Sequence, residues 1–177
     1  NLQDFVARVN SDLLGKYINI ASRSAGFLVK RFEGCILDSA MAHPLLATIT
    51  SSSNGIAELF ESREYAKAIR QIMELADLVN GFVDENKPWD LAKDLTRSAQ
   101  LHEVCSVILE SFRCLSLYLK PVLPKLVSNV EAFLGVPAMQ WQDIKTSLKS
   151  SSPIQPYKHL MTRVEQTQLD ELLKLNL

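Results

Sequence analysis

The chain has 177 residues and a formal net charge of −1, with 19 Lys and Arg against 20 Asp and Glu. Apolar residues make up 47% of the chain and charged residues 22%, which is typical of a globular domain and excludes a disordered segment or a polybasic, histone-like binder. No apolar run approaches the roughly 20 residues that a membrane span needs, so we expect no membrane partner.

A helical pattern opens the chain. Apolar residues recur at steps of three and four over residues 2–32, and Gly34 is well placed to stop a helix there. Residues 38–61 indicate one shorter helix or two, because the SSSNG stretch at residues 51–55 is typical of a break or loop. The sequence therefore predicts one helix of about 30 residues, followed by shorter ones.

Two longer helices are predicted in the middle of the chain. The apolar period returns over residues 62–84, and Pro88 then suits a turn or the first position of a short helix. The period returns again over residues 98–119, where Pro121 ends the helix and Pro124 can lie in the first turn of the next one.

The last third of the chain is less regular. A helix that ends at about residue 133 is closed by Gly135, and residues 136–157 indicate an irregular stretch. The apolar pattern then predicts a closing helix at about Arg163–Lys174.

These elements predict the fold class. No segment favours a strand, so we expect an all-α fold, an antiparallel helical bundle of four to five main helices. It would form one domain, residues 1–177, in which residues 136–177 supply an irregular stretch and a C-terminal helix that packs back.

The chain carries no catalytic constellation that can be recognised. Its three cysteines and three histidines are too scattered for a metal site, and no Gly-rich phosphate loop occurs. Cys105 and Cys114 fall within an apolar helical period, so we expect them to be buried and reduced, as in a cytoplasmic protein. The sequence predicts no catalytic residue, cofactor or metal ligand in this chain.

A strip of polar residues lies beside the apolar seam of the first helix on a wheel drawn at about 100° per residue. Its members are Asp12, Lys16, Asn19, Arg23 and Lys30. Asn19 and Arg23 are four residues apart and offer an amide and a guanidinium, which suit the edge of a base. Lys16 and Lys30 could neutralise phosphates. A solvated face, which any long amphipathic helix has, accounts for the same pattern.

Two other features are open to two interpretations each. Trp89, in the motif NKPWD, either fills the core at a turn or offers a platform on which an unpaired base stacks, whereas Trp141 is expected to be a packing anchor. Residues 111–130 carry three cations and no acid, which indicates either a positive patch for phosphates or a solvated face. These cations are Arg113, Lys120 and Lys125.

Three segments in order carry a family resemblance. They are KYINIASRSAGFLVKRFEG at 16–34, SREYAKAIRQIMELADLVNGFVDENKPWDLAK at 62–93, and FRCLSLYLKPVLPKL at 112–126. Together with the ending PYKHLMTRVE at 156–165, they resemble the anticodon-binding domain of bacterial-type methionyl-tRNA synthetase, a class I aminoacyl-tRNA synthetase. One of these motifs alone would be weak evidence, whereas their order over a helical pattern is specific.

The resemblance implies that this domain reads the CAU anticodon in the loop of initiator and elongator methionine tRNA. Asn19 and Arg23 would hydrogen-bond the cytosine at the first anticodon position, and Trp89, preceded by Pro88 as in the family pattern, would stack on a splayed-out base. The full-length enzymes of this family join methionine to its tRNA with ATP.

The resemblance also implies what lies outside this chain. The ATP-site signatures HIGH and KMSKS are absent, as is the zinc-bearing insertion of the family. We therefore expect a piece of a longer protein, whose upstream Rossmann catalytic domain would be a further partner and would hold ATP and any zinc. This chain itself is expected to contain no catalytic site.

Two other functions remain open on the sequence. The chain could be the anticodon domain of another class I synthetase, for valine, leucine, isoleucine or cysteine, although these should lack the set of Asn19, Arg23 and Trp89. It could also be a helical protein-interaction bundle whose polar strip binds another protein.

Overall fold

The chain folds as a bundle of helices. The computed structural model describes residues 2–165, 167–168 and 171, and within these residues every regular element is helical. The all-α prediction is confirmed. In the same part of the chain, no helix combines the length and the apolar character that crossing a bilayer would require.

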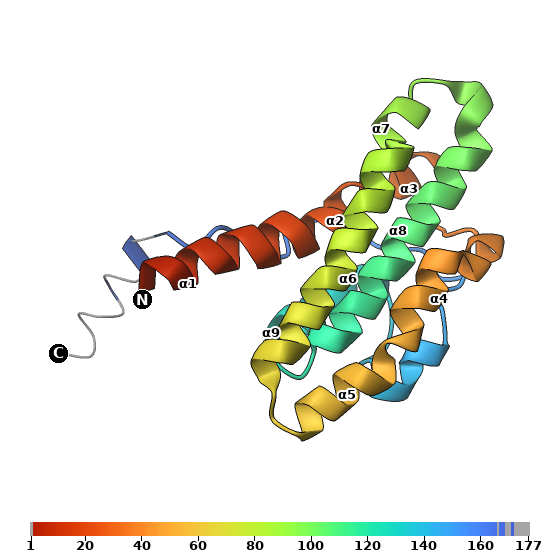
Figure 1. Ribbon diagram of the computed structural model, residues 1–177. Helices are drawn as coiled ribbons and strands as arrows, with labels where there is room; N and C mark the ends of the chain where they lie inside the picture. Colours follow the sequence, from red (N-terminus) through yellow and green to blue (C-terminus); the bar gives the residue numbers. More distant parts are fainter. Residues whose placement is uncertain (1, 166, 169–170, 172–177) are drawn as a thin grey trace.

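The centre of the bundle is α8 (Ser98–Leu119), which runs antiparallel to α6 (Tyr65–Asn86) (Figure 1). Every residue of α8 from Val104 to Leu119 is buried. The elements that contact it surround it: α4 (Pro44–Ser51), α7 (Pro88–Leu91), α9 (Pro124–Leu134), the 3-10 turns η2 (Asp38–Ala42), η3 (Leu95–Arg97) and η4 (Trp141–Lys145), and two helices of the N-terminal segment.

An ion pair lies inside this core. Arg113 donates to both carboxylate oxygens of Glu110, at 2.7–3.1 Å, and both side chains are only 4% exposed. Arg113 also donates to the carbonyl oxygens of Asp143 and Thr146, while Glu110 accepts from the Leu148 N–H at 3.0 Å. The pair thereby attaches the irregular stretch after α9 to α8.

A second ion pair lies at the end of α8, and the two together correct an expectation. Lys120 donates to Glu131 at 2.5 Å, and the same carboxylate oxygen accepts from the Met139 N–H at 2.8 Å. The interpretation of residues 111–130 as a positive patch is wrong for Arg113 and Lys120. Their partners Glu110 and Glu131, which neutralise them, lie immediately outside that range. A solvated face is equally wrong for the buried Arg113.

The N-terminal segment is broken where one long helix was predicted. It consists of α1 (Leu2–Arg8), the π-helical η1 (Val9–Ile18), α2 (Asn19–Ser22) and α3 (Ala25–Arg31). The break falls at Ser24, which is fully buried with φ −123°, and whose hydroxyl donates to the Ala21 carbonyl at 3.4 Å. A serine hydroxyl that bonds nearby backbone competes with the helical ladder, which accounts for the break.

The remaining boundaries follow the sequence pattern closely. The predicted break at residues 51–55 is limited to Ser52, since α5 (Ser53–Glu61) begins at once. Pro88 begins α7 and Pro124 begins α9, as predicted. Gly135 ends α9 with φ 67°, a left-handed conformation that glycine adopts without a steric cost.

The chain after α9 returns toward its beginning. Asn10 donates to the Val164 carbonyl and accepts from the Val164 N–H, both at 2.9 Å, which ties η1 to the chain around residue 164, beside the projecting α1 (Figure 1). Half of the predicted helix over Arg163–Lys174 lies within the described residues. Residues 163–165 are not helical, whereas residues 167–168 and 171 are.

The buried cysteines agree with the expectation. Cys105 and Cys114 are both 0% exposed, and burial raises the pKa of the Cys105 thiol to about 12. A thiol in such surroundings stays protonated and packs as a small apolar group.

The buried pair gives a prediction of stability. Arg113→Met leaves the Glu110 carboxylate buried without its cation, and we expect the free energy of unfolding to fall by about 3–5 kcal/mol. Urea unfolding followed by circular dichroism measures the change. The double variant Glu110→Leu/Arg113→Met removes both charges and should recover part of the loss. A double variant no more stable than Arg113→Met would show that the bonds to the backbone dominate instead.

Candidate nucleic-acid interface

Arg23 follows α2 directly and reaches across to α6. Its Nη1 donates to Asn80 Oδ1 at 3.0 Å and lies 3.8 Å from Asp84 Oδ1. The Arg23 side chain is 35% exposed, whereas Asp84 is 69% exposed. A guanidinium has five N–H donors. One edge of Arg23 is therefore held by α6, while donors remain for a ligand.

Asn80 is the residue that holds Arg23 in place. Its Nδ2 donates to the Lys16 carbonyl at 2.9 Å and to the Ala76 carbonyl at 3.0 Å. The first of these bonds crosses from α6 to η1, and the second is within α6. Asn80 thus joins the N-terminal helix to α6 at the point where Arg23 emerges.

Asn19 begins α2 and lies one helical turn before Arg23, the residue that follows this helix, and the Arg23 N–H donates to the Asn19 carbonyl at 3.1 Å. Asn19 is exposed, and its Nδ2 donates to the Gly15 carbonyl at 3.1 Å. An amide has two N–H hydrogens and a carbonyl oxygen, so this single bond leaves hydrogen-bonding capacity for a ligand.

The two lysines predicted to bind phosphates differ in their surroundings. Lys16 donates to Asp77 Oδ2 at 2.9 Å, and this hydrogen bond raises its pKa. A phosphate at Lys16 would have to compete with that carboxylate. Lys30 is exposed and makes no ion pair among the described residues. Because of the break at Ser24, Lys30 belongs to α3 and does not continue the strip of the helical wheel.

Trp89 is the second residue of α7 and directly follows the tight turn at Lys87 that joins α6 to α7. Right-handed helical backbone is disfavoured before proline, and Lys87 takes the left-handed conformation with φ 44° while its N–H bonds the Val83 carbonyl. Pro88 is buried, and Trp89 is 41% exposed. The interpretation of Trp89 as a core plug is wrong, because the proline takes the inner position.

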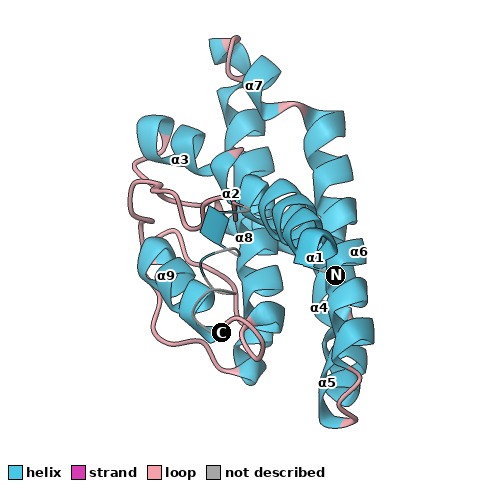
Figure 2. Cartoon of the chain, turned by 90° about the vertical axis from the view of Figure 1, so that its left-hand side faces the viewer, coloured by secondary structure: helices cyan, strands magenta, loops and turns pink. Residues whose placement is uncertain are grey.

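Arg23 lies against the C-terminal end of α6, which is also the end where the turn to α7 begins. Asp84 is two residues before the end of α6 at Asn86, and Trp89 follows three residues later. Arg31 Nη2 donates to the Ala92 carbonyl just after α7 at 2.5 Å, which fastens α3 to this turn. Figures 1 and 2 show α7 at the tip of the bundle, with α3 on the same half. The exposed side chains of Asn19 and Trp89 and the half-buried Arg23 are thus carried by connected elements.

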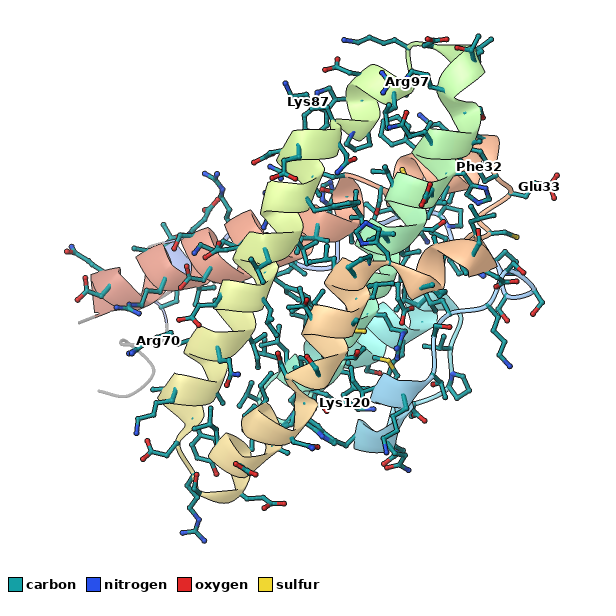
Figure 3. All side chains as sticks on the ribbon, turned by 45° about the vertical axis from the view of Figure 1, so that its right-hand side comes forward. Phe32, Glu33, Arg70, Lys87, Arg97 and Lys120 are labelled. Carbon is teal, nitrogen blue, oxygen red and sulfur yellow. The ribbon has the colours of Figure 1, made fainter. Side chains whose placement is uncertain are left out.

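Several residues of this region were missed by the sequence analysis. They are Arg31, Asn80, Asp84 and Lys87. Asn80 and Asp84 lie four apart in the motif ADLVNGFVDEN, and a wheel of α6 would have placed them on one polar face. Lys87 and Arg97 both lie at the α7 end, whereas Arg70 lies toward the other end of α6 (Figure 3).

The described residues contain no group of three or more His, Cys, Asp or Glu side chains placed to hold a metal ion. What this region offers is an oriented guanidinium, an amide and an exposed indole. These groups recognise planar, hydrogen-bonding ligands such as unpaired bases.

Comparison with known proteins finds relatives that are methionine–tRNA ligases. The chain is 58% identical over 176 residues to the methionine–tRNA ligase of Ralstonia nicotianae, and 57% identical to that of Cupriavidus pinatubonensis. These alignments cover 99% of this chain and 26% of each relative, so the chain spans about a quarter of their length. No family model matches the chain. The identities confirm the resemblance that the motifs carried.

Solved structures share the fold. The apo form of Mycobacterium tuberculosis methionyl-tRNA synthetase superposes with a TM-score of 0.80 at 23% identity, over 90% of this chain and 34% of that one. The same enzyme bound by methionyl-adenylate gives a TM-score of 0.80 at 22% identity, with 90% and 33% covered.

The exposure of the two tryptophans gives a fluorescence prediction. Trp141 packs against Phe60 and Tyr118, with ring centroids 6.2 and 5.5 Å apart, which confirms it as a packing anchor. We expect acrylamide to quench Trp89 strongly in Trp141→Phe, and to quench Trp141 weakly in Trp89→Phe. Equal quenching in the two single-tryptophan variants would contradict the exposed position of Trp89.

Proposed function

We propose that this chain, which belongs to the methionyl-tRNA synthetase family, is its anticodon-binding domain and reads the CAU anticodon of initiator and elongator methionine tRNAs. The observation that carries the proposal is the half-buried Arg23 held on α6 by Asn80, next to the turn that exposes Trp89. The identity to methionine–tRNA ligases over 99% of the chain supports it. We propose that residues 1–177 belong to one domain, in which the described part of residues 136–177 packs back on the bundle.

The chemistry of cytosine fits the two polar groups. The Watson–Crick edge of cytosine has two acceptors, O2 and N3, and one amino donor. Arg23 can donate to the acceptors but can accept nothing, while the Asn19 carbonyl can accept from the amino group. Uracil presents an N–H at the ring position where cytosine presents N3. Arg23 would meet a donor there, which disfavours uracil.

Trp89 and the surrounding cations would supply affinity without much specificity. An exposed indole can stack on any unpaired base, which is worth about 1–3 kcal/mol per base. Lys30, in α3, and Lys87, directly before α7, are exposed cations, and α3 and α7 lie on the same half of the bundle (Figures 1 and 2). They are our candidates for phosphate contacts, together with Lys16 if a phosphate displaces Asp77. A net charge of −1 is compatible with this, since a few aimed donors suffice.

The other parts of the reaction belong to the portion of the relatives that this chain does not match. We propose that the full-length protein joins methionine to its tRNA with ATP in the cytoplasm, in a catalytic domain that contacts this one. ATP and any zinc would be bound there, since no such site is proposed in this chain. The relatives reported above are methionine–tRNA ligases, which favours methionine over valine, leucine, isoleucine or cysteine.

The first test concerns reading of cytosine. Fluorescence titration with anticodon stem-loops should show that a CAU loop binds more tightly than a UAU loop. Arg23→Ala should reduce that preference by about ten-fold or more, because a good pair of hydrogen bonds to a base edge is worth about 1–3 kcal/mol of discrimination. Arg70→Ala is the matched control for base reading, since it removes one arginine of α6 that lies toward the other end of this helix from the turn before Trp89 (Figure 3). Equal affinity of the native chain for both loops would disprove the proposal.

The second test concerns phosphates. Lys30→Ala and Lys87→Ala should each weaken all loops alike and lower the slope of log affinity against log salt by about 0.7, because each removes one contact to a single strand. Titrations at several salt concentrations measure the slope, with Arg70→Ala again as the control. An unchanged slope in both variants would remove these lysines from the interface.

A further inference from the structure

We infer that Asn80 is a positioning residue, which orients the Arg23 guanidinium so that it can discriminate cytosine. The inference rests on the proposed function and adds a residue that does not itself touch the base. It is carried by the three hydrogen bonds of one half-buried amide, to Arg23, Lys16 and Ala76.

The orientation of the Asn80 amide is fixed by its neighbours. The carbonyl oxygens of Lys16 and Ala76 only accept hydrogen bonds, so the NH₂ group of Asn80 must face them. The Oδ1 atom then faces Arg23 and accepts from its Nη1 at 3.0 Å. Reversing the amide would lose all three bonds. The network therefore decides which atom meets Arg23.

Asp84 is the other group near the guanidinium, and it is the weaker anchor. Its carboxylate is 3.8 Å from Nη1, which is beyond hydrogen-bonding distance, and its side chain is 69% exposed. Water and salt screen such a pair, so it restrains direction poorly. Asn80 is closer and less exposed.

The neutral charge of Asn80 also matters for reading a base. An amide oxygen holds one N–H of the guanidinium without neutralising it, which leaves Arg23 positive and its other donors available. A carboxylate at the same place would hold Arg23 more strongly and would compete with the base for it. Asn80 thus combines a fixed direction with a retained charge.

The test compares Asn80→Ala with a matched asparagine of the same helix. Asn86 donates to the Phe82 carbonyl four residues earlier at 2.9 Å, as Asn80 does to Ala76, but it makes no bond to Arg23. We expect Asn80→Ala to lower the CAU-over-UAU preference by about ten-fold, and Asn86→Ala to leave it unchanged. In the Arg23→Ala background, Asn80→Ala should cause no further loss of preference, because Asn80 acts through Arg23.

Asn80→Ser keeps the inference testable if Asn80→Ala does not fold. The serine hydroxyl can still bond the Ala76 carbonyl but is too short to reach Arg23, so the same loss of preference is expected. If Asn80→Ala or Asn80→Ser folds and keeps the preference while Arg23→Ala loses it, the inference is overturned and the proposed function stands. If the native chain has no preference for cytosine, both fail together.

Discussion

The burial of α8 on every side from Val104 to Leu119 is the constraint on which the other features depend. A helix surrounded by protein must satisfy each polar side chain internally, because no water reaches it. Glu110 and Arg113 satisfy each other and three backbone groups, and the hydroxyl of Ser116 pairs with that of Tyr17 at 2.6 Å. These bonds attach the irregular C-terminal stretch and the N-terminal helix to one central element.

The candidate site inherits its rigidity from this centre. Tyr17 stacks on Phe112 of α8 with ring centroids 4.9 Å apart, and the carbonyl of the preceding residue, Lys16, accepts from Asn80. The turn before Arg23 is thereby fixed by the core on one side and by α6 on the other. The helix that carries Asn19 and Arg23 is positioned by contacts that neither of these residues makes.

Sequence patterns predicted the elements well wherever proline or glycine marks an end. Pro88, Pro124 and Gly135 act through backbone geometry, which is local and readable from one residue. The break at Ser24 could not be predicted in this way, because serine tolerates both helix and break and the choice depends on burial in the folded chain. The spacing of the seam from Val6 to Phe27 continues through Ser24, which is its one polar member, and one polar residue does not by itself predict a break.

The same distinction applies to the candidate site. Spacing correctly placed Asn19 beside Arg23, because four residues make about one turn in any helix. It could not decide whether Trp89 was buried, since both answers fit the same motif and only the inward position of Pro88 resolves them. Nor could it find Asn80, because its contact with Arg23 joins residues 57 positions apart.

The partial burial of Arg23 has an energetic consequence for binding. A fully exposed arginine would lose hydration and side-chain freedom at the moment a ligand arrives, and both losses weaken binding. In this chain, folding has already removed part of the hydration of Arg23, because its side chain is 35% exposed. Folding has also restricted its side-chain freedom, because one N–H is bonded to Asn80. Complete burial would hide the donors that a base needs. The half-buried position lies between these limits, since one N–H of Arg23 is held by Asn80 while other donors stay accessible to a ligand.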